Sequence, residues 1–188
     1  KKGVRVTEVF SDTSAEKAGI MTGDLLLKLD GSVIQASRRE DAEVFENLVR
    51  QYPVDAEVEL TGVRNGEELE LTVPLQPRPV PPSQYLTYED ENFEFTVRDL
   101  AFEDRVSKRL EATQPGLLIA QVERAGWGAL AGLRNGDILL QIDGTTVAGL
   151  ESFKETMAAI EEKRQERVVF FIKRGIYTAY QELEPNWN

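Results

Sequence analysis

Few side chains of this sequence have the types and spacing that catalysis requires. The chain has neither histidine nor cysteine among its 188 residues. A Ser-His-Asp or Cys-His nucleophile therefore cannot be assembled from it, and neither can a zinc site with histidine or thiolate ligands. Ser14 and Lys17 have Ser-x-x-Lys spacing, but this short motif needs further serine and lysine elements to act as a nucleophile. An enzyme is the weakest interpretation, and no catalytic residue is assigned.

Aspartates beside glycines recur at matching places in the two halves of the chain. Asp24, Asp30, Asp137 and Asp143 each neighbour a glycine. Such carboxylates could suggest calcium, yet no twelve-residue loop of oxygen ligands contains them. An aspartate in a glycine-linked turn accepts hydrogen bonds from nearby backbone amides. We therefore expect these residues to shape turns, with no metal and no cofactor.

These aspartates belong to a sequence motif that occurs twice in the chain, 113 residues apart. Residues 18–31 read AGIMTGDLLLKLDG, and residues 131–144 read AGLRNGDILLQIDG. Leu25–Leu29 and Ile138–Ile142 are apolar runs of strand length, and the Asp-Gly pairs after them are strong signals for hairpin turns. The match continues without a gap from 4–34 onto 117–147. It predicts two domains built to one plan.

Each repeat is followed by the pattern of one helix and one hairpin. Residues 37–40, Ser-Arg-Arg-Glu, form a capping box that predicts a helix to about Gln51. The second helix is expected from about Leu150 to Glu162. The hairpins are expected around Asn65-Gly66 and Arg174-Gly175. The expected strands are 56–64, 68–75, 167–173 and 177–183.

Prolines between the halves predict a semi-rigid spacer. The fold class we predict is mainly β with a few helices, as two partly open β-barrel or sandwich domains. The predicted boundaries are 1–76 for domain 1, 77–84 for the linker and 85–188 for domain 2.

The charge balance excludes several classes of partner. The formal net charge is −11, whereas nucleic acids and anionic membrane surfaces attract clusters of lysine and arginine. No apolar run approaches the roughly 20 residues of a membrane span. The chain begins Lys-Lys-Gly, without a methionine or a signal-peptide pattern, so we interpret it as a piece of a longer protein.

The order of the elements resembles that of bacterial, circularly permuted PDZ domains. It runs through a strand, a short turn, the motif Ala-Gly-Leu-x-x-Gly-Asp-Ile-Leu-Leu-x-Ile-Asp-Gly, a strand, a helix and a hairpin. Two in tandem resemble the C-terminal part of Do/Deg (HtrA-like) trypsin-like serine proteases, in which a protease domain precedes them. The resemblance implies a module that binds extended peptides, or unfolded or C-terminal protein segments. It also implies the bacterial periplasm or cell envelope.

In PDZ domains the ligand adds a strand to an exposed edge strand and lies against the long helix. A preceding loop of pattern x-Φ-Gly-Φ points backbone amides at the terminal carboxylate of the ligand. The resemblance carries the loop onto Asn92-Phe93-Glu94-Phe95 and the strand onto Phe95-Thr96-Val97-Arg98. The helix wall that it implies is Leu150, Phe153, Met157 and Ile160.

One residue departs from this pattern. Glu94 stands where the pattern prefers glycine, so it adds negative charge and cannot easily adopt the positive φ that glycine permits. This departure counts against capture of a carboxylate terminus, although Arg98 could offset part of the charge.

Domain 1 begins on the strand equivalent to 117–122, so its loop and edge strand either lie upstream in the parent protein or are lacking from this half. Its helix face with Val44, Phe45 and Leu48 is therefore expected to be open. The alternative function is therefore structural. In that case the chain packs on its own protease domain or on another copy and binds no free peptide tightly, with Trp127 as a candidate contact.

Overall fold

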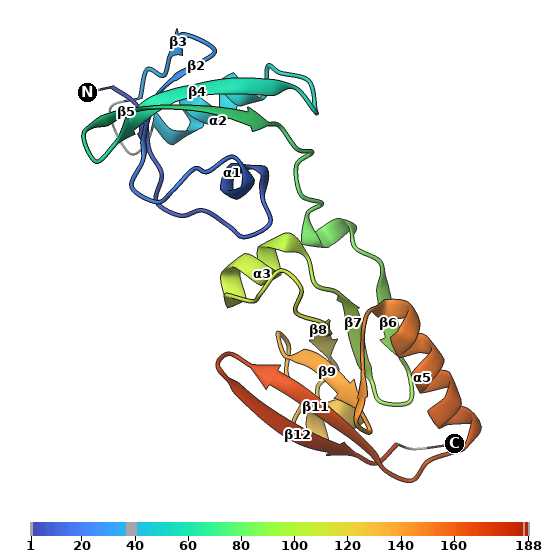
Figure 1. Ribbon diagram of the computed structural model, residues 1–188. Helices are drawn as coiled ribbons and strands as arrows, with labels where there is room; N and C mark the ends of the chain where they lie inside the picture. The colour runs from blue at the N-terminus through green and yellow to red at the C-terminus, as the bar shows by residue number, and fades with distance from the viewer. Residues whose placement is uncertain (1, 37–40, 186, 188) are drawn as a thin grey trace. The chain divides into compact units, whose positions relative to one another are not determined.

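The computed structural model describes residues 2–36, 41–185 and 187. The chain divides into two compact units, Lys1–Arg78 and Pro79–Asn188, with the boundary inside the proline-rich segment (Figure 1). The predicted capping box at 37–40 lies outside the described residues.

Unit 1 is built on one antiparallel sheet with the strand order β1-β2-β4-β5, and β3 pairs with β2. Apolar residues of the repeat and of β4 form its core, with Leu29, Ile34 and Leu60 fully buried. Its strands are β1 (Val4–Arg5), β2 (Leu25–Leu29), β3 (Ser32–Val33), β4 (Glu57–Arg64) and β5 (Glu67–Pro74). Its helices are α1 (Ser14–Lys17) and α2 (Ala42–Val49).

Unit 2 repeats this plan and extends it. Its sheet has the order β12-β11-β9-β8-β7-β6, and β10 pairs with β9. The strands are β6 (Thr87–Asp90), β7 (Phe95–Asp99), β8 (Leu117–Val122), β9 (Ile138–Ile142), β10 (Thr145–Thr146), β11 (Val168–Arg174) and β12 (Tyr177–Leu183). The helices are α3 (Phe102–Lys108), α4 (Trp127–Leu130), α5 (Leu150–Glu162) and the short 3-10 helix η2 (Pro82–Gln84).

The elements of the repeat are confirmed. The strands β2 and β9 and the helix α5 have the predicted bounds, and both hairpins lie where the turn signals put them. The fold is mainly β, as predicted, and neither sheet closes into a barrel among the described residues. Asp30 and Gly31 have φ of 46° and 74°, and Asp143 and Gly144 have 45° and 80°. Positive φ at both central positions is what a type I′ hairpin turn requires.

Both units also contain the same ion pair, between a buried aspartate and a partly exposed arginine. In unit 1, Arg64 donates from Nε to Asp24 Oδ1 over 2.7 Å and from Nη2 to the Gly19 carbonyl over 2.7 Å. In unit 2, Arg174 donates to Asp137 and to the Gly132 carbonyl in the same way, over 2.7 and 2.8 Å. The hydrogen bond from Arg64 is the main cause that lowers the pKa of Asp24.

The same aspartates accept hydrogen bonds from turn amides, those of Met21 and Arg134, as the turn interpretation predicted. Each aspartate thus ties the turn of the repeat to the first strand of the final hairpin. Within the described ranges, no group of three acidic side chains is placed to hold a metal ion.

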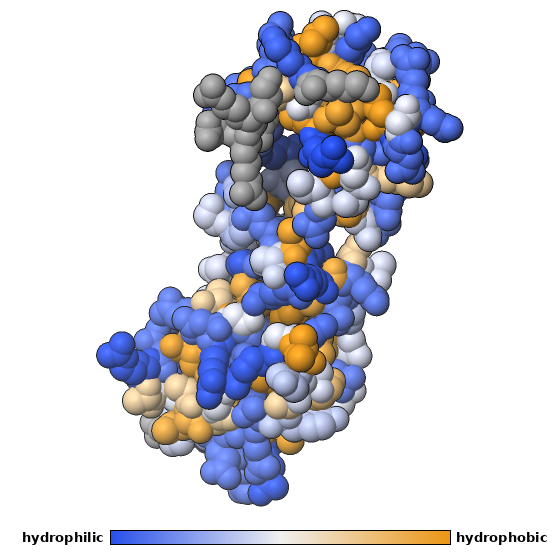
Figure 2. Space-filling model, turned by 90° about the vertical axis from the view of Figure 1, so that its left-hand side faces the viewer, coloured by the Kyte–Doolittle hydropathy of each residue, from blue (hydrophilic) through white to orange (hydrophobic). Residues whose placement is uncertain are grey.

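On the face drawn in Figure 2, blue side chains predominate and orange ones occur in smaller groups in each unit. None of the helices in the described part of the chain is both long and apolar enough to cross a bilayer.

Candidate functional site

The strand β7 has neighbours on both sides. It pairs antiparallel with β8, and on its other side Tyr88 and Asp90 of β6 stand opposite Val97 and Phe95. The prediction that 95–98 forms an exposed edge strand is therefore wrong. The missing signal was β6 itself, because its sequence Thr-Tyr-Glu-Asp is only four residues long and its two strand-favouring residues are followed by two acidic residues that disfavour strands.

The strand β6 lies between β7 and α5 (Figure 1). The Tyr88 ring meets the Phe153 ring of α5 edge-on, with centroids 5.7 Å apart, and Lys154 Nζ lies 6.0 Å from the centroid of the Tyr88 ring. Burial is the main cause that raises the pKa of the Tyr88 hydroxyl. In unit 2, the groove that the resemblance implied between β7 and α5 thus holds a strand of the same chain. We refer to it as the β7–α5 groove.

The predicted walls of this groove do come together, but as part of the core. Phe95 is 1% exposed and Val97 is 0% exposed. The Phe95 ring packs edge-on against those of Phe153 and Phe170, and Val97 joins the same buried cluster, which excludes water from the floor of the groove. Thr96 is half-buried. The predicted residues that join this one buried cluster are Phe93, Phe95, Val97, Leu150, Phe153, Met157 and Ile160.

The amides of the predicted loop already bind a carboxylate. The backbone amides of Asn92 and Phe93 donate to Asp90 Oδ1 over 3.1 and 3.0 Å, and the Glu94 amide donates to the Asp90 carbonyl over 2.8 Å. Asp90 is 4% exposed. Burial raises the pKa of its carboxyl, against the opposing effect of the two amides. The anion-binding amides of this loop are therefore satisfied from within the chain.

Glu94 adopts the backbone conformation that its side chain was expected to resist, with φ of 56°. Its carboxylate Oε2 accepts from the Trp127 amide over 2.9 Å, and the neighbouring Phe93 carbonyl accepts from the Gly128 amide over 2.8 Å. These two hydrogen bonds hold the loop against α4, which offsets the cost of a left-handed conformation.

Arg98 does not lie in the groove. On the face of β7 opposite Val97, its guanidinium donates to both carboxylate oxygens of Asp104 in α3, over 2.5 and 3.1 Å. Asp104 also accepts from the Ala101 amide over 2.8 Å. Burial raises the pKa of Asp104, but the hydrogen bonds from Arg98 and Ala101 outweigh it and leave the pKa lowered. Arg98 therefore anchors α3 and does not offset the charge of Glu94.

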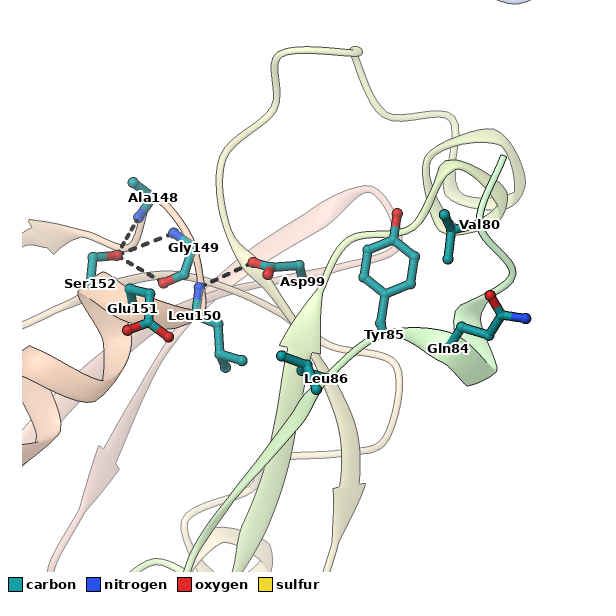
Figure 3. A pocket seen from close by; sticks show the side chains of 10 residues that line it. All are labelled: Val80, Gln84, Tyr85, Leu86, Asp99, Ala148, Gly149, Leu150, Glu151 and Ser152. Atoms are coloured by element: carbon teal, nitrogen blue, oxygen red, sulfur yellow. Dashed lines mark hydrogen bonds between the residues drawn. The ribbon is translucent and has the colours of Figure 1, made fainter. Parts of the chain in front are cut away.

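An open cleft of about 750 Å³ lies where the chain enters the groove, at the start of α5 (Figure 3). The first amides of α5 are already bonded, since Leu150 N donates to Asp99 Oδ1 over 3.1 Å and Gly149 N donates to Ser152 Oγ over 3.1 Å. Leu86, directly before β6, is 80% exposed. The lining residues are Val80, Gln84, Tyr85, Leu86, Asp99, Ala148, Gly149, Leu150, Glu151 and Ser152.

In unit 1, β1 pairs with β2 on one side, and no strand of the described residues covers its other side. In unit 2 the equivalent side of β8 carries β7. The helix face with Val44, Phe45 and Leu48 is half-buried. A separate cleft of about 440 Å³ lies between α2 and the end of β5, and it includes Phe45, Val49, Tyr52 and Leu75.

Two family models, both described as PDZ domain, match this chain over residues 1–75 and 118–174. The chain belongs to the PDZ domain family. It contains two such domains, one in each compact unit. Their resemblance to the PDZ regions of DegP and HtrA proteins, inferred from the repeated motif, is confirmed by homology to that class.

One relative is a probable periplasmic serine endoprotease DegP-like of Marinomonas sp. (strain MWYL1), 27% identical over 164 residues, which are 86% of this chain and 33% of the relative. Another, of the same description, is from Chlamydia pneumoniae, with 22% identity over 97% of this chain and 35% of the relative. The chain thus spans about a third of the length of these relatives. Among solved structures, an HtrA3 PDZ domain bound to a phage-derived ligand (FGRWV) matches 54% of this chain and 89% of its own, with 13% identity and a TM-score of 0.42.

Proposed function

We propose that this tandem PDZ chain is a non-catalytic peptide-binding module that serves substrate recognition or regulation in a DegP-like periplasmic serine protease. Unit 2 binds extended polypeptide as an added strand along β7. The observation that carries this proposal is the pairing of β6 with β7 beside α5. The β7–α5 groove thereby accommodates one extended strand through main-chain pairing and one aromatic side chain against the helix.

The arrangement separates affinity from specificity. Main-chain hydrogen bonds to β7 bind any extended segment, whereas the surface of Phe153 selects a large apolar side chain. The core residues beneath the strand keep both walls in place, because β7 is also held by β8. Binding of a peptide strand in the groove requires no catalytic group, and the chain contains neither histidine nor cysteine.

The test is a nuclear magnetic resonance titration of the isotope-labelled chain with synthetic decapeptides that each contain one central aromatic residue. We expect amide shifts confined to β6, β7 and α5. Matched peptides with N-methyl groups on alternate amides keep every side chain but lose main-chain donors, so they are expected to leave the spectrum unchanged. Shifts caused equally by both peptide sets would contradict strand addition, and the absence of any shift in β7 and α5 would contradict the site.

Val97→Pro, an obvious way to break pairing on an edge strand, is unsuitable here. Val97 is fully buried in an interior strand, where proline removes a ladder hydrogen bond and disrupts the fold. Peptide methylation tests the same pairing without changing the protein.

Docking on a protease domain or another subunit is the second candidate function. The β11–β12 hairpin favours it, since Ile176 in its turn is 86% exposed and Tyr180 in the middle of β12 is 70% exposed, with its ring 4.7 Å from that of Phe171. Exposed apolar groups on an edge strand are typical of interaction surfaces. Mass measurement by light scattering tests this candidate: a docking surface between copies predicts that the unmodified chain associates, that the Tyr180→Ser variant does not, and that neither binds the decapeptides tightly.

A further inference from the structure

We propose that β6 is a displaceable internal ligand that closes the β7–α5 groove of unit 2. In this proposal, which rests on the proposed function, the segment 86–91 occupies the position of a foreign peptide and must leave before one can pair with β7. The groove therefore exists in a closed form, which the structure contains, and an open form that accepts peptide.

The fit of β6 has the features of a bound peptide at three points. Its backbone runs antiparallel to β7 in register from Thr87 to Asp90. Its aromatic side chain, Tyr88, contacts Phe153 of the helix wall. At its far end, the carboxylate of Asp90 accepts hydrogen bonds from the loop amides of Asn92 and Phe93. One short segment thus fills the ladder, the side-chain site and the amide site together.

The attachment of β6 is weak in comparison with that of β7. Only four residue pairs join it to β7, and no described strand pairs with its outer side. Leu86, at its entrance, is exposed beside the open cleft, and Tyr88 is half-buried. Segments with few buried apolar contacts open locally at much lower free energy than the core. In contrast, β7 keeps β8 and its buried Phe95 and Val97 when β6 leaves.

Competition between β6 and a foreign peptide for the groove lowers the observed affinity for that peptide. The observed affinity for a foreign peptide equals the intrinsic affinity multiplied by the fraction of molecules with an open groove. Tethering gives β6 an effective concentration of about millimolar order, so a free peptide of the same sequence competes poorly with it. Weakening β6 should therefore strengthen the binding of a foreign peptide, whereas damage to a purely structural strand should weaken it.

A reversible lock tests this proposal directly. Glu89 and Thr96 stand opposite each other on β6 and β7, and the chain has no cysteine of its own. The Glu89→Cys/Thr96→Cys variant therefore forms one possible disulfide, at a spacing that neighbouring strands allow. The probe is fluorescein-labelled Leu-Thr-Tyr-Glu-Asp with a free C-terminus, the sequence of residues 86–90, and binding is followed by anisotropy.

We expect the oxidised variant to bind this probe at least about tenfold more weakly than the same reduced protein, because the lock removes the open form. We also expect Tyr88→Ala to bind it at least about tenfold more tightly than the unmodified chain. Tyr177→Ala, which removes an exposed tyrosine outside the groove, is the matched control and should leave affinity unchanged. The oxidised and reduced forms share one sequence, so a folding defect cannot explain a difference between them.

Two results would overturn the proposal. Equal binding by the oxidised and reduced forms would show that β6 does not block the site, and equal binding by Tyr88→Ala and the unmodified chain would show that it does not compete. If either result accompanied decapeptide shifts in β7 and α5, unit 2 would still bind peptides, but not by replacing β6 on β7, and only this inference and the strand-addition mode would be rejected. If no variant bound the probe or any decapeptide, both proposals would be rejected.

Discussion

The ring of Tyr88 meets the ring of Phe153 at 72°, with centroids 5.7 Å apart. This contact joins a four-residue strand to the helix that forms one wall of the groove, across 65 residues of sequence. It is the aromatic contact between β6 and α5, so its strength affects how readily the β7–α5 groove opens.

A double-mutant cycle should detect this contact. Tyr88→Leu and Phe153→Leu, singly and together, are expected to give a coupling free energy of about 0.5–1.5 kcal/mol, the range for edge-to-face aromatic pairs. Both tryptophans, Trp127 and Trp187, lie in unit 2, so tryptophan fluorescence during urea unfolding follows that unit. Additive effects of the two substitutions would mean that the rings do not interact energetically.

Loss of the repeated ion pair should destabilise unit 2. Arg174→Met leaves the fully buried Asp137 carboxylate without its main partner, so we expect a loss of about 3 kcal/mol in the free energy of unfolding. Arg167→Met is the matched control, since it breaks the exposed pair with Glu182 and should cost less than about 1 kcal/mol. Similar unfolding midpoints for the two variants would contradict the structural role of Arg174.

Asp104 should stabilise unit 2 at neutral pH and lose that effect in acid. Its folded pKa is lowered below the usual value of 3.8, so its contribution is present above that value and disappears as the pH falls through the folded pKa. Compared with Asp104→Asn, the unmodified chain should have an advantage at pH 7 that shrinks toward pH 2, measured by urea unfolding. A constant difference across this range would exclude the Arg98–Asp104 pair as the cause.

Asp90 should behave in the opposite way. Burial raises its folded pKa above 3.8, so the stability linked to its protonation is present below that value and is lost as the pH rises through the folded pKa. The free energy of unfolding of the unmodified chain relative to Asp90→Asn should therefore decrease from pH 3 to pH 7. The same urea titrations measure it, and a relative stability that increases with pH would show that the loop amides outweigh burial.

The close approach of Gly126 to Glu94 predicts a rescue. A Cβ at position 126 would lie 2.8 Å from Glu94 Oε2 and 2.9 Å from Glu94 Cβ, so Gly126→Ala should cost about 1–3 kcal/mol of stability. In a Glu94→Gly background the same substitution should cost clearly less, because the obstructing side chain is gone and glycine accepts positive φ. An unchanged cost in that background would place the strain elsewhere.

The sequence by itself determined the two PDZ domains and most of their elements. The strands, the hairpin turns and α5 follow from local patterns, such as the Asp-Gly pairs and the spacing of Leu150, Phe153, Met157 and Ile160. It also identified apolar residues of β7 and α5 that share one buried cluster, because apolar side chains on a strand and a helix that pack together exclude water.

Only the tertiary structure decided what lies between those walls. The sequence of β6 is short and polar, and it becomes a strand because β7 supplies its hydrogen-bond partners and Phe153 supplies its apolar contact. Arg64 and Arg174 likewise meet their aspartates from 40 and 37 residues away. Local propensity depends on neighbours along the chain, whereas these contacts depend on neighbours in space. For this reason the sequence predicted the β7–α5 groove but not the strand β6 that lies in it.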